Sequence, residues 1–156
     1  MSRHHNSGFS IVEALVALVV LSVGMLGIAA LYVESLRAGR TAVYRTQAVN
    51  LAADMADRIR ANRAVPDSWV LGAGAAPATH NCVGGGVTCT PEDLAEDDQA
   101  SWLDAIRSQM PGNGAATASG TIEVDQLASP PQYQITVTWF EPGEQQPLTY
   151  VLTMQT

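Results

Sequence analysis

The longest hydrophobic run of the chain lies near its N-terminus, from Ala14 to Val33. These 20 residues carry no charge. As an α-helix rising about 1.5 Å per residue they would be about 30 Å long, which is the thickness of a bilayer core. A buried globular helix is the alternative, but such helices usually keep a polar side, and this run is apolar on every face. The pattern therefore predicts a membrane-spanning helix.

After this run the hydrophobic residues become periodic. Apolar side chains recur at intervals of three, four or seven residues, which is typical of a helix with one buried face. They are Leu36, Val43, Ala48, Leu51, Met55 and Ile59. We therefore expect one helix over about 9–62, with local bending or partial unwinding at Gly24 and Gly27. Aspartates and arginines between the apolar positions are spaced to form exposed ion pairs, Asp54 with Arg58 and Asp57 with Arg60.

The next segment, 64–91, is rich in glycine, alanine and proline and is predicted to be a loop. A second helix begins after Thr90, which can act as the N-cap, with Pro91 at the first position and acidic residues in the first turn. The sequence Pro111-Gly112 ends it. Its apolar residues could pack onto a sheet; they are Leu94, Trp102, Leu103, Ile106 and Met110.

Three segments toward the C-terminus alternate between apolar and polar residues, as half-buried strands do. The alternation is weak over Thr121 to Leu127 and strong from Tyr133 to Trp139. It resumes from Leu148 to Met154, after turn residues at 141–144. We interpret the aromatic residues of these segments as core and not as a binding platform.

These elements predict an α+β fold in which a long N-terminal helix packs on a small antiparallel sheet. The chain would consist of four parts. Residues 1–8 form a leader, 9–33 a transmembrane helix, 34–63 its amphipathic continuation and 64–156 an exported globular domain.

Charge is distributed unevenly between the two halves of the chain. Residues 1–63 contain seven arginines and four acidic residues, a net charge of +3, whereas 64–156 contain one arginine and eleven acidic residues, a net charge of −10. The part 64–156, with its negative net charge, lacks the positive surface that neutralises phosphates. No nucleic-acid partner is therefore predicted. Arg3 and two histidines precede the apolar run with no acidic residue before Glu13, which favours a cytoplasmic N-terminus and an exported C-terminus.

The two cysteines, Cys82 and Cys89, both lie in the exported part, where an oxidising compartment lets a disulfide persist. We expect them to be bonded, which would stabilise the domain by roughly 2 to 3 kcal/mol through closure of a short loop. A metal site at His80 and the cysteines would lack a fourth ligand nearby. The acidic run at 96–98 lacks the ligand pattern of an EF-hand loop and is interpreted as a solvated face. No metal or cofactor is predicted.

The polar leader differs from an ordinary secretory signal, in which the cleavage site follows the hydrophobic stretch. Here the small residue Gly8 precedes that stretch, so a cut after it would retain the helix. The motif Gly8-Phe9-Ser10-Ile11-Val12-Glu13, followed by Ala-Leu-Val-Ala-Leu, resembles the processing site of type IV prepilins and of the related pseudopilins of type II secretion. The resemblance implies the type IV pilin fold, cleavage after Gly8 by a membrane aspartyl peptidase, and methylation of the new amine of Phe9.

Glu13 calls for an explanation, because a carboxylate near the hydrocarbon costs about 2.5 kcal/mol or more unless it is paired, neutral or able to reach the interface. The resemblance implies that it pairs with the amine of Phe9, its own or that of a neighbouring subunit, as the helix enters a filament. The alternative is a carboxylate that lies at the headgroup boundary without a role.

Two later parts of the sequence are similar to the minor pilins called PilV. They are Asn50-Leu51-Ala52-Ala53-Asp54-Met55-Ala56-Asp57-Arg58-Ile59-Arg60-Ala61-Asn62-Arg63, and Cys89 to Ala95 with Asp98, Trp102 and Met110 to Gly114. The resemblance implies a structural subunit that joins other minor pilins and the major pilin, primes assembly and enters the pilus tip or fibre. It also implies the prepilin peptidase, the inner-membrane assembly platform and a tip adhesin as partners. The subunit would be a single-pass inner-membrane protein before assembly and part of a surface pilus afterwards.

Three alternative functions differ in the features that they require. A minor pseudopilin of type II secretion would share the leader, Glu13 and the fold. An enzyme would need an activated nucleophile or an acid–base pair in the exported domain, whose one histidine, His80, lies in a predicted loop, so no enzyme is predicted. A membrane-tethered ligand-binding module is the third alternative.

Overall fold

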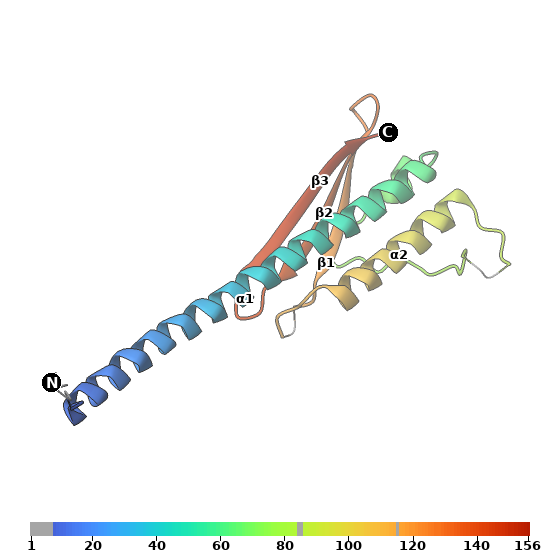
Figure 1. The fold of residues 1–156 in the computed structure, drawn as a ribbon. Helices are drawn as coiled ribbons and strands as arrows, with labels where there is room; N and C mark the ends of the chain where they lie inside the picture. The colour runs from blue at the N-terminus through green and yellow to red at the C-terminus, as the bar shows by residue number, and fades with distance from the viewer. Residues whose placement is uncertain (1–7, 84–85, 115) are drawn as a thin grey trace, which may run out of the picture. The chain divides into compact units, whose positions relative to one another are not determined.

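The computed structural model of the protein describes residues 8–83, 86–114 and 116–156. The elements in chain order are helix α1 (Ile11–Ala61), the 3-10 helix η1 (Pro66–Trp69), helix α2 (Pro91–Gln109) and strands β1 (Ser119–Asp125), β2 (Gln132–Phe140) and β3 (Pro147–Gln155) (Figure 1). The α+β class is confirmed, with a long N-terminal apolar helix and a small antiparallel sheet. Of the predicted leader, only Gly8 is among the described residues.

The chain divides into two compact units, Met1–Arg40 and Thr41–Thr156. The division falls inside α1 and within the segment 34–63. The last part of α1 therefore belongs to the same unit as the sheet.

In the first unit, α1 is long and apolar enough to cross a membrane, and none of its most hydrophobic stretch is buried. The helix continues without a break through Gly24 and Gly27, so the predicted unwinding there is wrong. A glycine costs about 1 kcal/mol relative to alanine inside a helix, which is too little to interrupt one whose neighbours are mostly leucine, alanine and valine. Leu36, one of the predicted core positions, is 52% exposed in this unit.

The second unit contains a three-stranded antiparallel sheet in the order β1-β2-β3. Ile135 in the central strand pairs with Ile122 of β1 and with Leu152 of β3. Alternate residues of β2 are buried, including Tyr133 and Trp139, which confirms that these two aromatic residues belong to the core.

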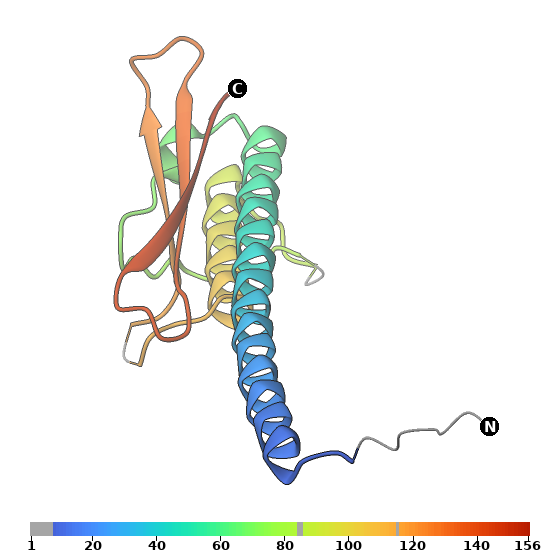
Figure 2. The same cartoon turned by 60° about the vertical axis from the view of Figure 1, so that its left-hand side comes forward.

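One face of this sheet is covered by α2 and by the part of α1 that belongs to the second unit (Figure 2). The covering residues of α1 recur with helical spacing and are buried; they are Ala48, Leu51, Ala52, Met55, Ala56 and Ile59. Trp102 of α2 joins the two helices, since its Nε1–H donates to the Leu51 carbonyl (2.8 Å). Gly120 of β1 allows the sheet to approach, because a Cβ there would overlap the Trp102 ring and lie 2.8 Å from Ile106 Cδ1.

One predicted core position of this unit is wrong, because Val43 is 61% exposed. Leu94 is partly buried, and its neighbour Ala95 is fully buried. The helical period identified the buried stripes of both helices, but the first fully buried residue of α2 is Ala95.

The segment 64–91 is not all loop. Pro66 starts η1, whose Trp69 is fully buried and donates its Nε1–H to the Asn62 carbonyl (3.0 Å). Leu71 then forms a bridge with Ile122 of β1 through two backbone hydrogen bonds of 2.9 and 3.0 Å. These contacts attach the connection to the sheet.

Candidate functional site

Gly8, Phe9 and Ser10 immediately precede helix α1. The Ser10 hydroxyl accepts a hydrogen bond from the Val12 N–H (3.3 Å), and the Ser10 carbonyl accepts one from the Ala14 N–H (3.2 Å). Ser10 is therefore the N-cap of the helix. This role was not predicted from the sequence, although a serine directly before the apolar run is a typical signal for it.

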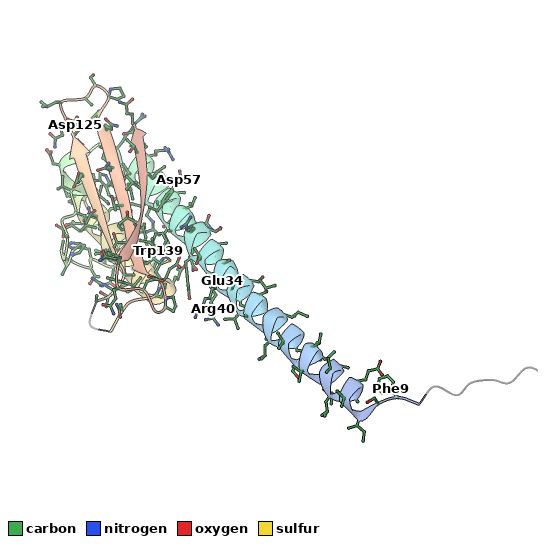
Figure 3. All side chains as sticks on the ribbon, turned by 90° about the vertical axis from the view of Figure 1, so that its left-hand side faces the viewer. Phe9, Glu34, Arg40, Asp57, Asp125 and Trp139 are labelled. Carbon is green, nitrogen blue, oxygen red and sulfur yellow. A yellow bond between two sulfur atoms is a disulfide. The ribbon has the colours of Figure 1, made fainter. Side chains whose placement is uncertain are left out.

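The peptide bond between Gly8 and Phe9 is open to solvent. Phe9 is 73% exposed at the start of the helix (Figure 3). A Cβ built on Gly8 would meet no atom within 4 Å, so nothing in the described structure requires glycine at this position. An enzyme could reach this bond without opening the fold.

Glu13 lies in the first turn of α1 and is exposed. Its negative charge is favourable beside the unpaired N–H groups of a helix N-terminus. Among the described residues it forms no ion pair. It is the one charged residue along a hollow of 720 Å³ on one side of the helix, lined by Ser10, Val12, Glu13, Val16, Ala17, Val20 and Leu21.

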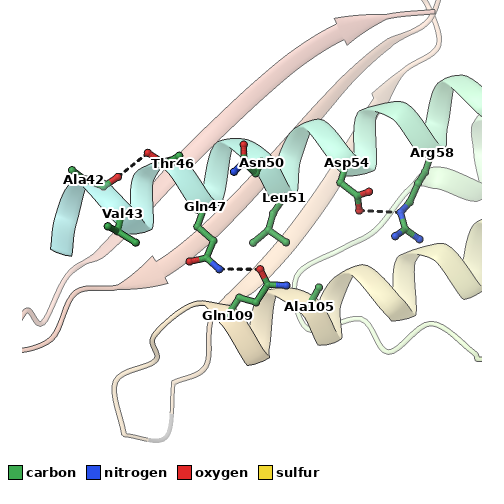
Figure 4. A pocket seen from close by; sticks show the side chains of 10 residues that line it. All are labelled: Ala42, Val43, Thr46, Gln47, Asn50, Leu51, Asp54, Arg58, Ala105 and Gln109. Atoms are coloured by element: carbon green, nitrogen blue, oxygen red, sulfur yellow. Dashed lines mark hydrogen bonds and ion pairs between the residues drawn. The ribbon is translucent and has the colours of Figure 1, made fainter. Parts of the chain in front are cut away.

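In the second unit, a groove of 650 Å³ runs between α1 and α2 (Figure 4). Gln47 bridges it by donating from Nε2 to Gln109 Oε1 (2.9 Å). Arg58 forms the predicted ion pair with Asp54 (3.0 Å) and a second one with Asp98 of α2 (2.6 Å). Partial burial lowers the pKa of Arg58, but its bonds to the two aspartates outweigh that effect and raise it. The polar groups of this groove are thus largely occupied with one another.

The predicted ion pair between Asp57 and Arg60 is also present, at 2.7 Å. Both side chains are more than half exposed, so this pair contributes little to stability.

Cys82 and Cys89 are joined in a disulfide, as predicted, with their Cα atoms 5.8 Å apart. Asp97 of α2 holds the start of this loop, because its carboxylate accepts from the backbone N–H groups of His80 (2.7 Å), Asn81 (3.1 Å) and Cys82 (3.1 Å). The prediction of a solvated acidic face is therefore wrong for Asp97, which is 8% exposed.

The hydrogen bonds around this loop shift the pKa values of Asp97 and His80. The bond from the His80 N–H is the main cause of a lowered pKa at Asp97, because it stabilises the charged carboxylate. The ring of His80 bonds Glu96 (2.9 Å) and faces Asp93 (3.8 Å). The bond to Glu96 is the main cause of a raised pKa at His80.

Within the described residues no group of three or more histidine, cysteine, aspartate and glutamate side chains could hold a metal ion. Both cysteine sulfurs are used by the disulfide, so neither can act as a thiolate ligand or nucleophile. The carboxylates of Asp97 and Asp93 accept hydrogen bonds from backbone N–H groups before and after the disulfide.

Two protein-family models match the chain. Residues 3–29 match the model described as the prokaryotic N-terminal methylation motif, and residues 30–100 match the model described as type IV pilin Tt1218. The first match contains Gly8, Phe9 and Glu13, and the second contains the cysteines and the first half of α2. No curated protein and no solved structure matches the chain.

Proposed function

We infer, from the type IV pilin segment and the N-terminal methylation motif, that this chain is a structural subunit of the type IV pilin family. The long apolar helix and the small antiparallel sheet are consistent with the type IV pilin fold. Members of this family are generally non-catalytic. The apolar helix fits membrane anchoring followed by assembly into a filament.

The first step proposed is processing of the leader, with cleavage after Gly8 and methylation of the Phe9 amine. The methylation motif covers this junction. Phe9 is exposed, and Gly8 has open space around it. Because Ser10 caps the helix from the C-terminal side of the bond, a cut there would leave the first turn of α1 intact.

The second step is pairing of Glu13 with a processed amine. Its carboxylate lies along an apolar side of the helix and has no ionic partner among the described residues. In a bilayer or a packed filament such a group is costly unless it is neutralised. The amine of Phe9, from the same subunit or a neighbouring one, would provide the charge and would help to set axial register.

The place proposed in the pilus is that of a minor pilin related to PilV, which primes assembly with other minor pilins and enters the tip or the fibre. The two segments that carry the resemblance are packed together in the second unit. Asn62 Nδ2–H donates to the Pro91 carbonyl (2.6 Å), Arg58 pairs with Asp98, and Trp102 bonds Leu51. The resemblance therefore extends over both sides of one interface in the fold.

Its partners would be other minor pilins, the major pilin, the prepilin peptidase, the assembly platform and a tip adhesin. Before assembly the chain would span the inner membrane once, with its N-terminus in the cytoplasm and residues 64–156 in the periplasm. The first of the two family matches, with Gly8, Phe9 and Glu13 inside it, is the observation that carries the proposal.

The experiment compares Glu13→Ala with Glu34→Ala, a change at the other acidic residue of the first unit. The mature N-terminus is determined by mass spectrometry of protein from membranes and from sheared pili. We expect N-methylated Phe9 in all three chains, and depletion of Glu13→Ala alone from the pili. An intact Met1 on the mature protein would overturn the processing step. Wild-type amounts of Glu13→Ala in pili would remove Glu13 from assembly, and recovery in a periplasmic secretion fibre would identify a pseudopilin.

A further inference from the structure

Two basic residues follow the apolar run of α1 on the same helix. The run ends at Val33, and Arg37 and Arg40 come four and seven positions later. Both arginines are exposed and belong to the unit Met1–Arg40. At a rise of about 1.5 Å per residue, their Cα atoms lie about 6 and about 10 Å beyond that of Val33. They take no part in the functions described above.

These distances place the two arginines at the level of lipid headgroups when the apolar run fills the hydrocarbon core. The core is about 30 Å thick and the whole bilayer about 40 to 45 Å, which leaves about 5 to 8 Å for each headgroup layer. Side chains of an α-helix also lean toward its N-terminus. Arginines that follow the run can therefore extend their guanidinium groups back toward it, into the layer of lipid phosphates.

Neither guanidinium group forms an ion pair with a described residue, although Glu34 lies three positions before Arg37 (Glu34 and Arg40 are labelled in Figure 3). At about 100° per residue, Arg37 and Arg40 are about 60° apart around the helix, and Glu34 is about 120° from Arg40. Two positive charges thus share one side of α1. Three arginines of the other unit each bond an aspartate within 3.2 Å; they are Arg58, Arg60 and Arg107.

The same side of the helix carries apolar groups between the arginines and the run. Tyr32, Leu36 and Arg40 follow one another at intervals of four residues, so they lie along one line of the helix surface. Tyr32 is 67% exposed and Leu36 52% exposed. Tyrosine is enriched at bilayer interfaces, because its ring is apolar and its hydroxyl polar. The order aromatic, aliphatic, basic matches a phospholipid from its upper acyl chains to its phosphate.

We propose that Arg37 and Arg40 bind the phosphate of an anionic phospholipid, with Tyr32 and Leu36 against its glycerol group and upper acyl chains. An anionic lipid is favoured over a zwitterionic one, because the ammonium group of the latter offsets the charge that attracts the arginines. A free phosphate ion has no chains for Tyr32 and Leu36 to contact. The proposal rests on the membrane anchoring inferred above, but not on leader processing or on assembly.

Carboxylates of a second copy are the other source of negative charge, since residues 64–156 carry eleven acidic side chains. The lipid is favoured by position. Every phospholipid beside the apolar run has its phosphate at the level of Arg37 and Arg40, whereas a carboxylate reaches that level only if a second chain docks in one register.

The test measures the lipid selectivity of the full chain reconstituted in phosphatidylcholine vesicles. The probes are phosphatidylglycerol and phosphatidylcholine that carry the same nitroxide on the same acyl chain. Electron paramagnetic resonance gives the fraction of each probe that the protein immobilises. We expect phosphatidylglycerol to be preferred, and the preference to persist when inorganic phosphate replaces chloride at equal ionic strength.

Two double variants with the same change of charge separate the site from general electrostatics. Arg37→Gln with Arg40→Gln should reduce the preference about fivefold for each arginine, the effect of one basic residue near an anionic surface. Arg45→Gln with Arg63→Gln removes two exposed arginines that form no ion pair with the described residues. The control should keep the preference, because even Arg45 is about 18 Å beyond Val33 along the helix.

Equal preference for the two lipids in the wild type, equal losses in the two variants, or displacement of phosphatidylglycerol by inorganic phosphate would each overturn the lipid site. A preference that disappears as the protein-to-lipid ratio rises would also overturn it, in favour of carboxylates of a second copy. Immobilised lipid of both kinds without preference would leave membrane anchoring intact, whereas the absence of immobilised lipid would overturn anchoring itself. The two inferences can therefore fail separately.

Discussion

The two units of the chain use hydrophobic residues in opposite ways. In Met1–Arg40, Leu18 is 58% exposed and Leu26 72% exposed. In Thr41–Thr156, Met55 and Ile59 belong to the same helix and are fully buried. The second unit therefore has its own core. The apolar side chains in the described part of the first unit are exposed, so lipid or other subunits would have to cover them.

Truncation of a large side chain would give the sharpest contrast between the units. Trp102→Ala removes a fully buried ring and its bond to Leu51, and should lower the free energy of unfolding by about 3 to 5 kcal/mol. Leu18→Ala, in the first unit, should leave it unchanged. Urea unfolding of the full chain in detergent, followed by near-UV circular dichroism, measures both. Similar losses from the two changes would contradict the division into a packed and an unpacked unit.

Loss of the disulfide should have the next largest effect. Cys82→Ser with Cys89→Ser should reduce the free energy of unfolding by roughly 2 to 3 kcal/mol, because the unfolded chain regains the freedom that a closed loop removes. A reducing agent should produce the same loss in the wild type and none in the double variant. An unchanged unfolding midpoint would show that the bonds to Asp97 hold the loop without help.

Adding a methyl group would distinguish the units again, on a smaller scale. At Gly120 the added Cβ collides with Trp102, so Gly120→Ala should cost about 1 to 3 kcal/mol of unfolding free energy. At Gly27 no atom lies within 4 Å of the added group, so Gly27→Ala should cause no loss. The same urea experiment serves, and a tolerated alanine at position 120 would contradict the close approach of β1 to α2.

The smallest expected effect is a dependence on pH in the disulfide loop. Because the pKa of His80 is raised, mainly by its bond to Glu96, the stability that protonated His80 contributes is fully present below about pH 6.5, the ordinary histidine value. It is lost as pH rises through the higher folded value. The lowered pKa values of Asp93 and Asp97 act at the other end. Their contribution is present above about pH 4 and is lost as pH falls below it.

Unfolding midpoints at about pH 5 and about pH 8 would test the histidine contribution. The wild type should be less stable at the higher pH, and His80→Gln should lose that difference. A variant with the same dependence as the wild type would assign it to other groups.

Much of the fold could be predicted because its signals are local. The uncharged run before Glu34, the helical spacing from Ala48 to Ile59 and the alternation through β2 each follow from a few neighbouring residues. The N-cap at Thr90 was predicted in the same way and is confirmed by its bond from the Asp93 N–H (3.2 Å).

What the sequence could not show depends on segments that meet only in the fold. Asp97 looks like a surface acid until the backbone of 80–82 approaches it. The second partner of Arg58 is on another helix. Leu36 and Val43 follow the same period as the buried residues of α1, but no element of the described structure covers them. Periodicity shows which side of a helix is apolar. How much of that side is buried depends on the length of the element that packs against it.

All three tryptophans of the chain, Trp69, Trp102 and Trp139, lie in the second unit, and each is almost completely shielded from water. Tryptophan fluorescence, excited at wavelengths where tyrosine does not absorb, therefore observes that unit alone, because the apolar helix that would enter a bilayer contains Tyr32 but no tryptophan. Quenchers attached to lipid acyl chains should leave the emission bright in vesicles. Dimming would show that the folded unit itself touches the membrane.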